Sequence, residues 1–282
     1  MKHPPNASER AEATKSEPDG AVSAFIICQD EASKIGTCLE SVQFCDEIVV
    51  VDSGSTDGTV AVVEDYRSKG WPIRLISHPW SGFAKQKQFA LEQCSRRWCL
   101  NLDADEQIDE ALAAEILHTI ASGPEETGFH LYRRNWLPGY GYAHPATARD
   151  QVTRLVRRDS ARYNLDLAIH ERLLINGRTG HLRRGEILHK PDLSPEQELE
   201  KQNRYTSLKA LERFEEGRPA RPWRMLTSSL GYFLKQYLLK RYFLCGWAGV
   251  GLSMLSAQYG FQTEFKHWRL CQKAVRKDHN EL

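Results

Sequence analysis

The chain contains 282 residues, of which 41% are hydrophobic and 27% charged, and its 38 Lys and Arg are matched by 37 Asp and Glu. This length and composition allow a packed core and exclude a collagenous, low-complexity or wholly disordered chain. The seven cysteines are an odd number and form no C-x-x-C pair, which favours reduced thiols over a disulfide framework. The polar N-terminus carries charges of both signs and does not resemble a secretory signal.

The nearly balanced charge conceals an asymmetry along the chain. Residues 201–282 contain 15 basic and 6 acidic residues, whereas residues 1–200 contain 23 basic and 31 acidic residues. An acidic front and a basic back predict two surfaces with different partners. Residues 1–20 lack hydrophobic periodicity and are expected to form a disordered tail. We expect an α/β domain over 21–192 and a helical, basic, aromatic-rich region over 193–282.

Short apolar runs alternate with helical patterns from residue 22 onward. The spacing predicts strands at 22–28, 47–51, 73–77 and 98–102, and helices at 31–42, 55–69, 83–94 and 109–121. The strands are apolar throughout rather than in alternation, which is typical of a mostly parallel sheet covered by helices on both faces. Asp109 is expected to cap the helix that starts beside it.

Acidic residues follow three of the predicted strands, at the edge where sheets of this kind bind ligands. The first strand is followed by Asp30 and Glu31, the second by Asp52, and the fourth by Asp103 and Asp105. These carboxylates would repel one another unless a positive charge lay between them, and a divalent cation is the simplest source. The D-x-D spacing places two carboxylates on the same side of an extended segment, where Mg²⁺ or Mn²⁺ could bind.

The run 48–59 joins the second strand to the next helix through a loop of small residues. Backbone N–H groups in such a loop can face an anion or the edge of a base, and Asp52 can accept hydrogen bonds from a nucleobase or ribose. The alternative is a turn with an N-cap at Thr56 or Asp57. Both interpretations can hold for different residues of the run.

Several spaced motifs carry a family resemblance. The runs SAFIICQDEASKIGTCLESV, DEIVVVDSGSTDGT, GFAKQKQFALEQC and WCLNLDADEQI resemble the family 2 glycosyltransferases of the GT-A fold. The later runs RLVRR, AIHERL, EILHK and LKRYFLCGWAG resemble a narrower subgroup that contains bacterial lipopolysaccharide core glycosyltransferases, among them a β-1,4-glucosyltransferase. The resemblance covers residues 21–270 and makes 21–192 the nucleotide-sugar-binding catalytic domain.

The resemblance implies an inverting, metal-dependent hexosyltransferase. Such an enzyme would move a sugar from a nucleotide diphosphate donor of the UDP-glucose type to a lipid-linked saccharide, in lipopolysaccharide core or cell-envelope glycan biosynthesis. The resemblance places Asp30 or Glu31, Asp52 and Asp103 near the donor nucleotide and Asp105 on the metal. The loop after the second strand and the start of the third helix add Ser53, Lys85 and Gln86 as donor-binding candidates, and the D-x-D pair with His189 adds Asp103 and His189 as candidate ligands of Mg²⁺ or Mn²⁺. A single histidine such as His189 can equally have a structural role.

An inverting transfer needs a carboxylate base that deprotonates the acceptor hydroxyl. Many relatives carry this base in an acidic pair well after D-x-D, whereas this chain has His170 and Glu171 there. Glu171 is the favoured base, and Asp150 and Asp166 are the alternatives.

Several basic residues near these motifs have two open interpretations. Lys85, at the start of the third predicted helix, could face the donor or acceptor sugar, whereas Lys87 could equally be a surface charge. Arg154, Arg157 and Arg158 could contact acceptor phosphates or form a solvated strand edge.

The C-terminal region is rich in aromatic residues. Residues 223–268 hold 11 of the 27 aromatic residues, and residues 242–263 include no Asp, Glu, Lys or Arg. Helical spacing places Leu226, Leu230 and Leu234 on one face. The favoured interpretation is an amphipathic segment in the interface of an anionic membrane, and the alternatives are helices packed on the catalytic domain or in a dimer, or a true membrane span. The expected location is cytoplasmic, peripheral on the inner face of the cytoplasmic membrane.

Two other functions remain open from the sequence. A sugar nucleotidyltransferase would use a Gly-rich basic loop after the first strand, but residues 28–31 are acidic and lack glycine. A non-catalytic lipid-binding or scaffold protein is the alternative of another class, and the D-x-D motif with Asp52 argues against it. No basic-aromatic platform or helix-turn-helix pattern indicates a nucleic-acid partner. The donor sugar and its base, the acceptor and the oligomeric state are not determined by the sequence.

Overall fold

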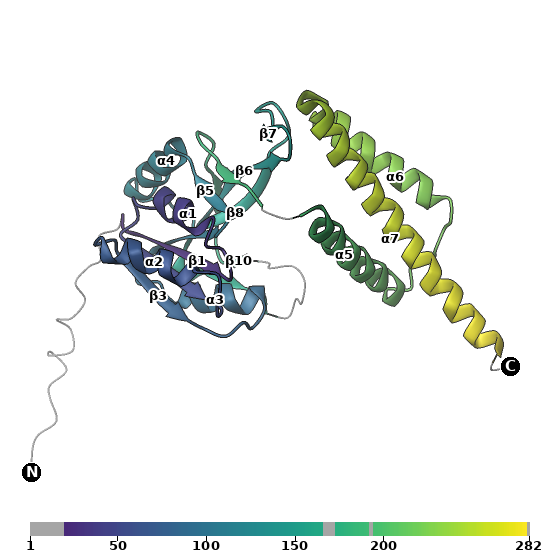
Figure 1. Ribbon diagram of the computed structural model, residues 1–282, viewed down its shortest axis with the longest axis horizontal. Helices are drawn as coiled ribbons and strands as arrows, with labels where there is room; N and C mark the ends of the chain where they lie inside the picture. Colours follow the sequence, from purple (N-terminus) through teal and green to yellow (C-terminus); the bar gives the residue numbers. More distant parts are fainter. Residues whose placement is uncertain (1–19, 166–172, 192–193, 281–282) are drawn as a thin grey trace, which may run out of the picture. The chain divides into compact units, whose positions relative to one another are not determined.

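The computed structural model describes residues 20–165, 173–191 and 194–280, and these residues form two compact units (Figure 1). The first unit consists of the described residues up to 134 together with 150–190, and the second consists of 135–149 together with the residues from 191 onward. The division after residue 190 lies close to the expected end of the α/β domain at 192. The segment 135–149 belongs to the second unit, although the sequence analysis placed it in the first.

Among the described residues of the first unit, a mixed sheet runs in the order β3-β2-β1-β4-β8-β6-β12-β5. Its strands are β1 (Val22–Cys28), β2 (Glu47–Asp52), β3 (Ile73–Ser77), β4 (Trp98–Asp103), β5 (Glu106–Ile108), β6 (Gly128–Leu137), β8 (Asp150–Arg157) and β12 (Ile187–His189), with β11 (Thr179–His181) beside β6. The neighbours β3, β2, β1 and β4 are parallel, and β8 is antiparallel to β4 and β6. The parallel half therefore brings the carboxyl ends of four strands to one edge of the sheet.

The parallel strands are buried between two layers of helices (Figure 1). The helices are α1 (Ile35–Ser41), α2 (Thr59–Ser68), α3 (Phe83–Gln93) and α4 (Glu110–Ala121). Along β1, Ala24 and Ile26 pack toward α1, α2 and α4, whereas the alternate residues Phe25 and Ile27 pack with α3. All seven residues of β1 are buried, which explains why its sequence is apolar without alternation.

Each predicted strand is present within one residue of its expected bounds, and the predicted α/β fold class is confirmed. Helix α2 begins at Thr59, four residues later than its pattern indicates. The reason lies in the preceding loop, where Asp57 accepts a hydrogen bond from the N–H of Ala32 (2.9 Å). Asp57 also accepts from the N–H of Thr59 (3.0 Å), but the N-cap position of α2 is Gly58, which offers no capping side chain, so the expected N-cap at Thr56 or Asp57 is wrong.

The second unit is mainly helical. Its long helices are α5 (Pro195–Glu215), α6 (Arg224–Leu234) and α7 (Gly246–Asn280), with a π-helical turn (Lys235–Leu239) after α6 and a 3₁₀ turn (Tyr242–Cys245) before α7. The short strand β7 (Gly141–Tyr142) pairs with the end of β6. No helix in the described part of the chain, α7 included, has both the length and the apolar character needed to cross a membrane.

A buried carboxylate joins the three long helices. Glu264 of α7 accepts hydrogen bonds from Arg213 of α5 (2.9 Å) and from Arg224 of α6 (3.1 Å), and Ser228 of α6 donates to the same oxygen (3.1 Å). In the sequence, Glu264 is the single acidic residue between 217 and 277. Because Glu264 is 5% exposed, it contributes little negative charge to the surface of this part of the chain.

Asp109 caps α4 as the sequence indicates, because its Oδ1 accepts a hydrogen bond from the N–H of Leu112 (2.7 Å). Its Oδ2 also accepts from the N–H of Glu186 (3.0 Å). We expect Asp109→Ala to lower the free energy of unfolding, measured by urea denaturation, by about 1–2 kcal/mol. Glu110→Ala, at the exposed next position, should change it by less than about 0.5 kcal/mol. Equal losses in the two variants would contradict the capping role.

Candidate active site

The loops after β1 and β2 are joined by hydrogen bonds from acidic residues. Asp30 adopts a positive φ of 55°, and its Oδ1 accepts from the N–H of Thr56 (2.7 Å). The N–H of Asp30 donates to Ser55 Oγ (2.9 Å). Asp52, which is buried, accepts from the N–H groups of Gly54 (2.9 Å) and Ser55 (3.1 Å). The two aspartates therefore order the loops where the sequence analysis expects the nucleotide.

The other expected nucleotide contacts differ in their surroundings. Gln86 is buried, and its Nε2 donates to Ser53 Oγ (3.0 Å) and to the carbonyl oxygen of His78 (3.1 Å). These two hydrogen bonds of Gln86 connect the start of α3 to the residues that follow β2 and β3. Lys85, next to it on the helix, is exposed. Glu31 forms an ion pair with a lysine of its own loop (2.6 Å).

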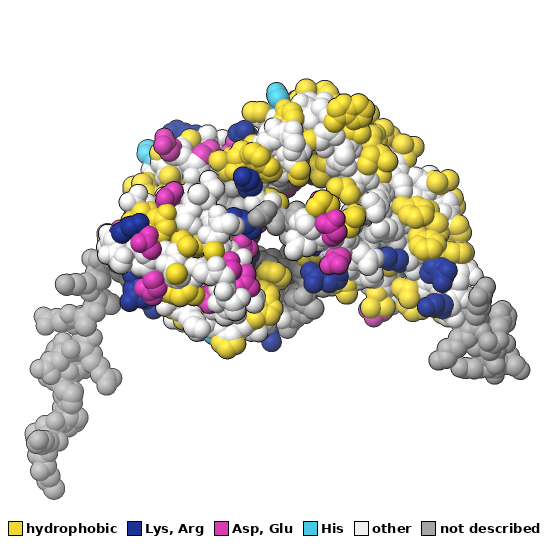
Figure 2. All heavy atoms as spheres, viewed as in Figure 1, with side chains coloured by type: hydrophobic (Ala, Val, Ile, Leu, Met, Phe, Trp, Pro, Cys, Tyr) yellow, Lys and Arg dark blue, Asp and Glu magenta, His cyan; other side chains and the backbone are white. Residues whose placement is uncertain are grey.

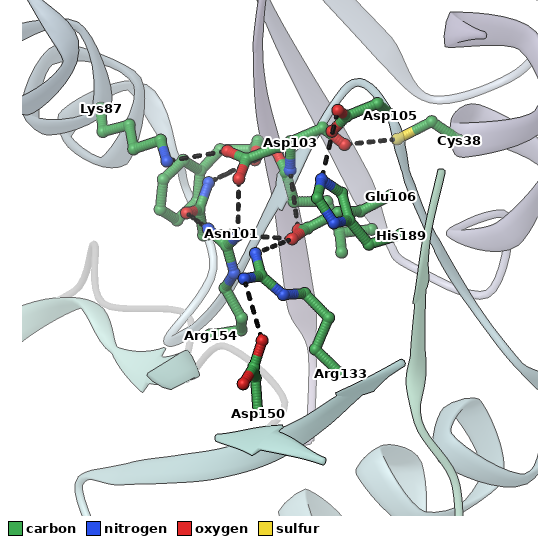
Figure 3. Close-up of polar contacts among 12 residues, drawn as sticks. Cys38, Lys87, Asn101, Asp103, Asp105, Glu106, Arg133, Asp150, Arg154 and His189 are labelled. Carbon is green, nitrogen blue, oxygen red and sulfur yellow. Dashed lines mark hydrogen bonds and ion pairs between the residues drawn. The ribbon is translucent and has the colours of Figure 1, made fainter. Parts of the chain in front are cut away.

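Asp103 lies between two cations at the end of β4 (Figure 3). Its Oδ1 is 2.7 Å from Nζ of Lys87 on α3, and its Oδ2 is 2.6 Å from Nη2 of Arg154 on β8. Lys87 is 3% exposed and Arg154 is 7% exposed. The interpretations of Lys87 as a surface charge and of Arg154 as part of a solvated strand edge are therefore wrong.

The ion pairs continue from Arg154 to Glu106, whose side chain is fully buried. Oε1 of Glu106 is 2.7 Å from Nη2 of Arg154 and 3.1 Å from Nη1 of Arg133, and its Oε2 accepts from the N–H of Asp103 (3.1 Å). Nη2 of Arg133 lies 3.8 Å from Oδ2 of Asp150. We call this alternating series of charges the strand-end network; its members are Lys87, Asp103, Arg154, Glu106, Arg133 and Asp150.

The network sets the charge states of its central pair. Burial alone would raise the pKa of Asp103, but Arg154 and Lys87 hold that pKa well below its ordinary value. Burial alone would lower the pKa of Arg154, but Asp103 and Glu106 hold it above its ordinary value. Asp103 and Arg154 are therefore both charged at neutral pH. Part of the positive charge that the clustered acids require is therefore supplied by side chains.

A cavity of about 410 Å³ opens beside the strand-end network. Its lining residues are Lys87, Asn101, Asp103, Arg133, Val152, Thr153, Arg154, Tyr163 and Leu173. This volume falls within the range of small-molecule sites. Three cations among the lining residues suit an anionic group such as a diphosphate.

Asp105 points away from Asp103 and toward His189 (Figure 3). Pairing of β12 with β5 places His189 opposite Glu106, so that its Nε2 lies 3.3 Å from Oδ2 of Asp105. Burial alone would raise the pKa of Asp105, but the hydrogen bond from His189 lowers it.

The fit of Asp105 and His189 to a divalent cation can be judged from their chemistry. The described residues contain no group of three or more His, Cys, Asp or Glu that could hold a metal ion. A pair of protein ligands still suits an ion whose remaining ligands are substrate phosphates and water. An imidazole beside a carboxylate favours Mn²⁺ over Mg²⁺. Asp103 fits less well, because both of its oxygens face cations.

The remaining candidates are the three expected bases and the arginines Arg157 and Arg158. Glu171 and Asp166 lie outside the described residues, whereas Asp150 lies on β8 with a side chain that is 37% exposed. Arg157 pairs with a nearby aspartate (2.9 Å), and Arg158 donates to a backbone carbonyl (3.0 Å).

Asn101 and Arg133 also line the site, although neither was expected from the sequence. Oδ1 of Asn101 accepts from Nη1 of Arg154 (2.6 Å), and the hydroxyl of Tyr163 lies 3.2 Å from the same oxygen. The signal that could have identified Asn101 is a polar residue inside the apolar run WCLNL. A buried polar side chain in a strand needs a partner, and Arg154 is that partner.

Known proteins resemble the chain over most of its length. The family model described as "Glycosyl transferase family 2" matches residues 23–127. The chain is 42% identical over 245 residues to the "Lipopolysaccharide core biosynthesis glycosyltransferase LpsC" of Rhizobium meliloti (strain 1021), which covers 87% of this chain and 91% of that protein. The chain belongs to glycosyl transferase family 2. This confirms the resemblance read from the motifs, including its lipopolysaccharide core subgroup.

Two further comparisons agree with this membership. An uncharacterized glycosyltransferase of Rickettsia felis is 30% identical over 84% of this chain and 85% of that protein. The structure of the mannosyltransferase PcManGT from Pyrobaculum calidifontis, in complex with GDP-Man and Mn²⁺, matches with a TM-score of 0.53 and 14% identity. The match covers 88% of this chain and 86% of that chain, and it shows a shared GT-A fold.

The strand-end network predicts a large cost for removing Arg154 from this family 2 glycosyltransferase. Arg154→Met leaves Asp103 and Glu106 without the cation that they share. We expect the free energy of unfolding at neutral pH to fall by about 3–5 kcal/mol in urea denaturation. Arg157→Met, on the same strand but with a partner that is 63% exposed, should cost less than about 1 kcal/mol.

The cost of Arg154→Met should also depend on pH. In the wild-type chain the lowered pKa of Asp103 stabilises the folded state at neutral pH, and this contribution is lost as the pH falls through the lowered value. In the variant the pKa of Asp103 rises, because only Lys87 remains as its cationic partner, so that protonation relieves its penalty in acid. The difference between variant and wild type should therefore shrink toward about pH 4. A difference that is independent of pH would show that unpaired charge is not its cause.

Proposed function

We propose that this family 2 glycosyltransferase moves a sugar from a nucleotide diphosphate donor, of the UDP-glucose type, to a lipid-linked saccharide in lipopolysaccharide core biosynthesis. The observation that carries the proposal is the cavity at the strand ends, where Asp103 meets Lys87 and Arg154. The name of LpsC supports the pathway, since 42% identity extends over most of both chains. Family membership favours this transfer over a sugar nucleotidyltransferase.

We assign the two halves of the donor to two parts of the strand-end edge. The loops ordered by Asp30 and Asp52 would receive the nucleoside, together with Glu31 and Ser53. The cations of the cavity wall would bind the diphosphate, because guanidinium and ammonium groups donate several hydrogen bonds to phosphate oxygens. Lys85 is exposed at the start of α3 and could reach either sugar.

Asp105 and His189 are the residues that would hold Mn²⁺ or Mg²⁺. When bound, such an ion would neutralise charge on the leaving diphosphate. Asp103, the third expected ligand, is engaged by Lys87 and Arg154, so we assign it to organising these cations.

We place the enzyme in the cytoplasm, against the inner face of the cytoplasmic membrane, where the second unit would bind anionic lipid. The exposed apolar residues of α6, α7 and their connection include Trp223, Leu226, Leu230, Leu238, Leu239, Trp247 and Met254, each more than half exposed. Figure 2 shows hydrophobic side chains gathered over α6 and α7. An apolar surface of this kind, with basic residues and one buried acid, is typical of a membrane-interface helix pair.

The metal assignment predicts that Asp105→Asn and His189→Gln each lower the rate of sugar transfer about a hundredfold. The measurement is transfer from the nucleotide sugar before and after chelation, followed by addition of Mn²⁺. Asp65→Asn, at an exposed ion pair of α2, is the matched control and should transfer at the wild-type rate. Near-normal transfer by Asp105→Asn with divalent ions chelated would exclude the metal role.

The base assignment predicts a difference between two carboxylates. We expect Glu171→Gln to lower kcat about 10²–10⁴-fold with little change in donor KM, because a general base acts on the acceptor proton. Asp150→Asn should have a smaller effect, because Asp150 already has Arg133 as a partner. The pH dependence of kcat should lose its acidic limb in the variant that lacks the base. If the acidic limb were lost in Asp150→Asn but kept in Glu171→Gln, Asp150 would be the base.

A further inference from the structure

A groove lies between α5 and α7 of the second unit and encloses about 380 Å³. Its lining residues are Ser207 and Leu211 of α5 and Phe265, Lys266, Arg269, Leu270 and Lys273 of α7. The α7 members are spaced at one, three and four residues, which places them on one side of the helix. The groove therefore belongs wholly to the second unit and is distinct from the cavity at the strand ends.

The walls of the groove combine apolar surface with cations. Leu211 is 41% exposed and Phe265 is 38% exposed, and Leu270 lies between the cations Lys266 and Lys273 in the sequence. No Asp or Glu is among the lining residues. Apolar side chains on a rim of positive charge suit a ligand with a negative head and a hydrocarbon body.

The cations of the groove lack acidic partners. Nζ of Lys266 is bonded to neutral acceptors, among them Oδ1 of Asn203 (2.6 Å) and Oγ1 of Thr206 (2.7 Å). Within the described part of the chain, Arg269 and Lys273 form no hydrogen bond or ion pair. Three positive charges therefore converge on one groove that has no carboxylate among its lining residues, which favours an anionic occupant.

The groove is continuous with the exposed apolar residues of the same helix. Trp247, Met254, Phe261 and Phe265 recur along α7 at intervals of seven, seven and four residues, and each is at least 38% exposed. Phe265 belongs both to this row and to the groove. A surface that lies in a lipid interface would thus bring lipid to the mouth of the groove.

We propose that the groove binds one anionic phospholipid of the membrane surface. Arg269 and Lys273 would bind the phosphate, and Leu211, Phe265 and Leu270 would contact the first part of the acyl chain. The proposal rests on the proposed function, in which this unit docks on an anionic membrane. The groove would add one defined lipid site to a surface that otherwise binds the membrane only through its exposed apolar residues and its positive charge.

The test uses the full-length protein and flotation with phosphatidylcholine vesicles that either contain or lack phosphatidylglycerol. We expect the wild type to float with the anionic vesicles, and the double variant Arg269→Gln, Lys273→Gln to bind them about thirtyfold more weakly. The matched control, Arg183→Gln with Arg184→Gln, removes the same charge from an exposed loop of the first unit and should bind within twofold of the wild type. Equal weakening in both double variants would overturn the proposal.

A second pair of variants separates the groove from general surface charge. Ser207→Trp places a ring in the groove and Leu211→Gln makes its wall polar, and both keep every cation. Each should abolish binding of a short-chain phosphatidylglycerol, measured by calorimetry below its micelle concentration. Unchanged binding in both variants, or preference of the wild type for an acidic peptide, would refute the lipid site.

These experiments distinguish failure of the lipid groove from failure of the proposed function. A wild type that floats, with groove variants indistinguishable from it, would leave membrane docking intact and exclude the groove. A wild type that floats with neither kind of vesicle would overturn both the groove and the membrane location. Sugar transfer to a detergent-solubilised acceptor would still report on the enzyme activity in either case.

Discussion

The first unit depends on the placement of one carboxylate, Asp103, between an ammonium and a guanidinium. Lys87 comes from α3 and Arg154 from β8, so that the helix layer, the parallel half of the sheet and its antiparallel half meet at one side chain of β4. Glu106 extends the contact to Arg133 on β6. Buried ion pairs add little stability compared with apolar packing, but a missing partner is costly. The network therefore fixes the arrangement of five elements, α3, β4, β5, β6 and β8, more than it stabilises the fold.

This arrangement also gives the cavity a fixed set of donors. Arg154 is held by Asn101, Asp103 and Glu106 at 2.6–2.7 Å, so its guanidinium is oriented before any ligand arrives. A ligand that binds preorganised groups loses less free energy to ordering them. An ammonium has three donors and a guanidinium five, so that each can contact a phosphate oxygen while keeping a carboxylate. The same ion pairs can thus maintain the fold and bind an anion.

The bounds of the strands could be predicted from the sequence because they depend on the pattern of apolar residues that are neighbours in the chain. The bounds of β1 and β3 match the expected strands residue for residue, and β1 is buried along its whole length. The burial of Lys87 was missed, although its position four residues from both Phe83 and Leu91 places it on one side of α3 with them. Arg154 lies 51 residues from Asp103 and 48 from Glu106, so no spacing in the sequence could pair them.

The source of the positive charge beside the clustered acids could not be assigned from the sequence for the same reason. Repulsion among the strand-end carboxylates does require positive charge, but the sequence does not say which chain segment or ion supplies it. For Asp103 the positive charge comes from Lys87 and Arg154, which lie on other elements. Asp105 instead faces His189, which the pairing of β5 with β12 places beside it. The two carboxylates of one D-x-D motif therefore have different chemistry, because alternate residues of a short turn point to different neighbours.

The second unit differs in having more cations than acids. In the first unit, acids and cations compensate one another in the interior. In the second unit, Glu264 is the single acid between 217 and 277, and Arg213 and Arg224 already pair with it. The remaining cations of that segment act outward, over a distance set by the ionic strength. Under the proposed function the acceptor is lipid-linked and diffuses in two dimensions, so an enzyme held at the same surface would meet it at a higher effective concentration than from solution. The basic residues of this segment, which contribute little to its fold, would then help the enzyme to encounter its substrate.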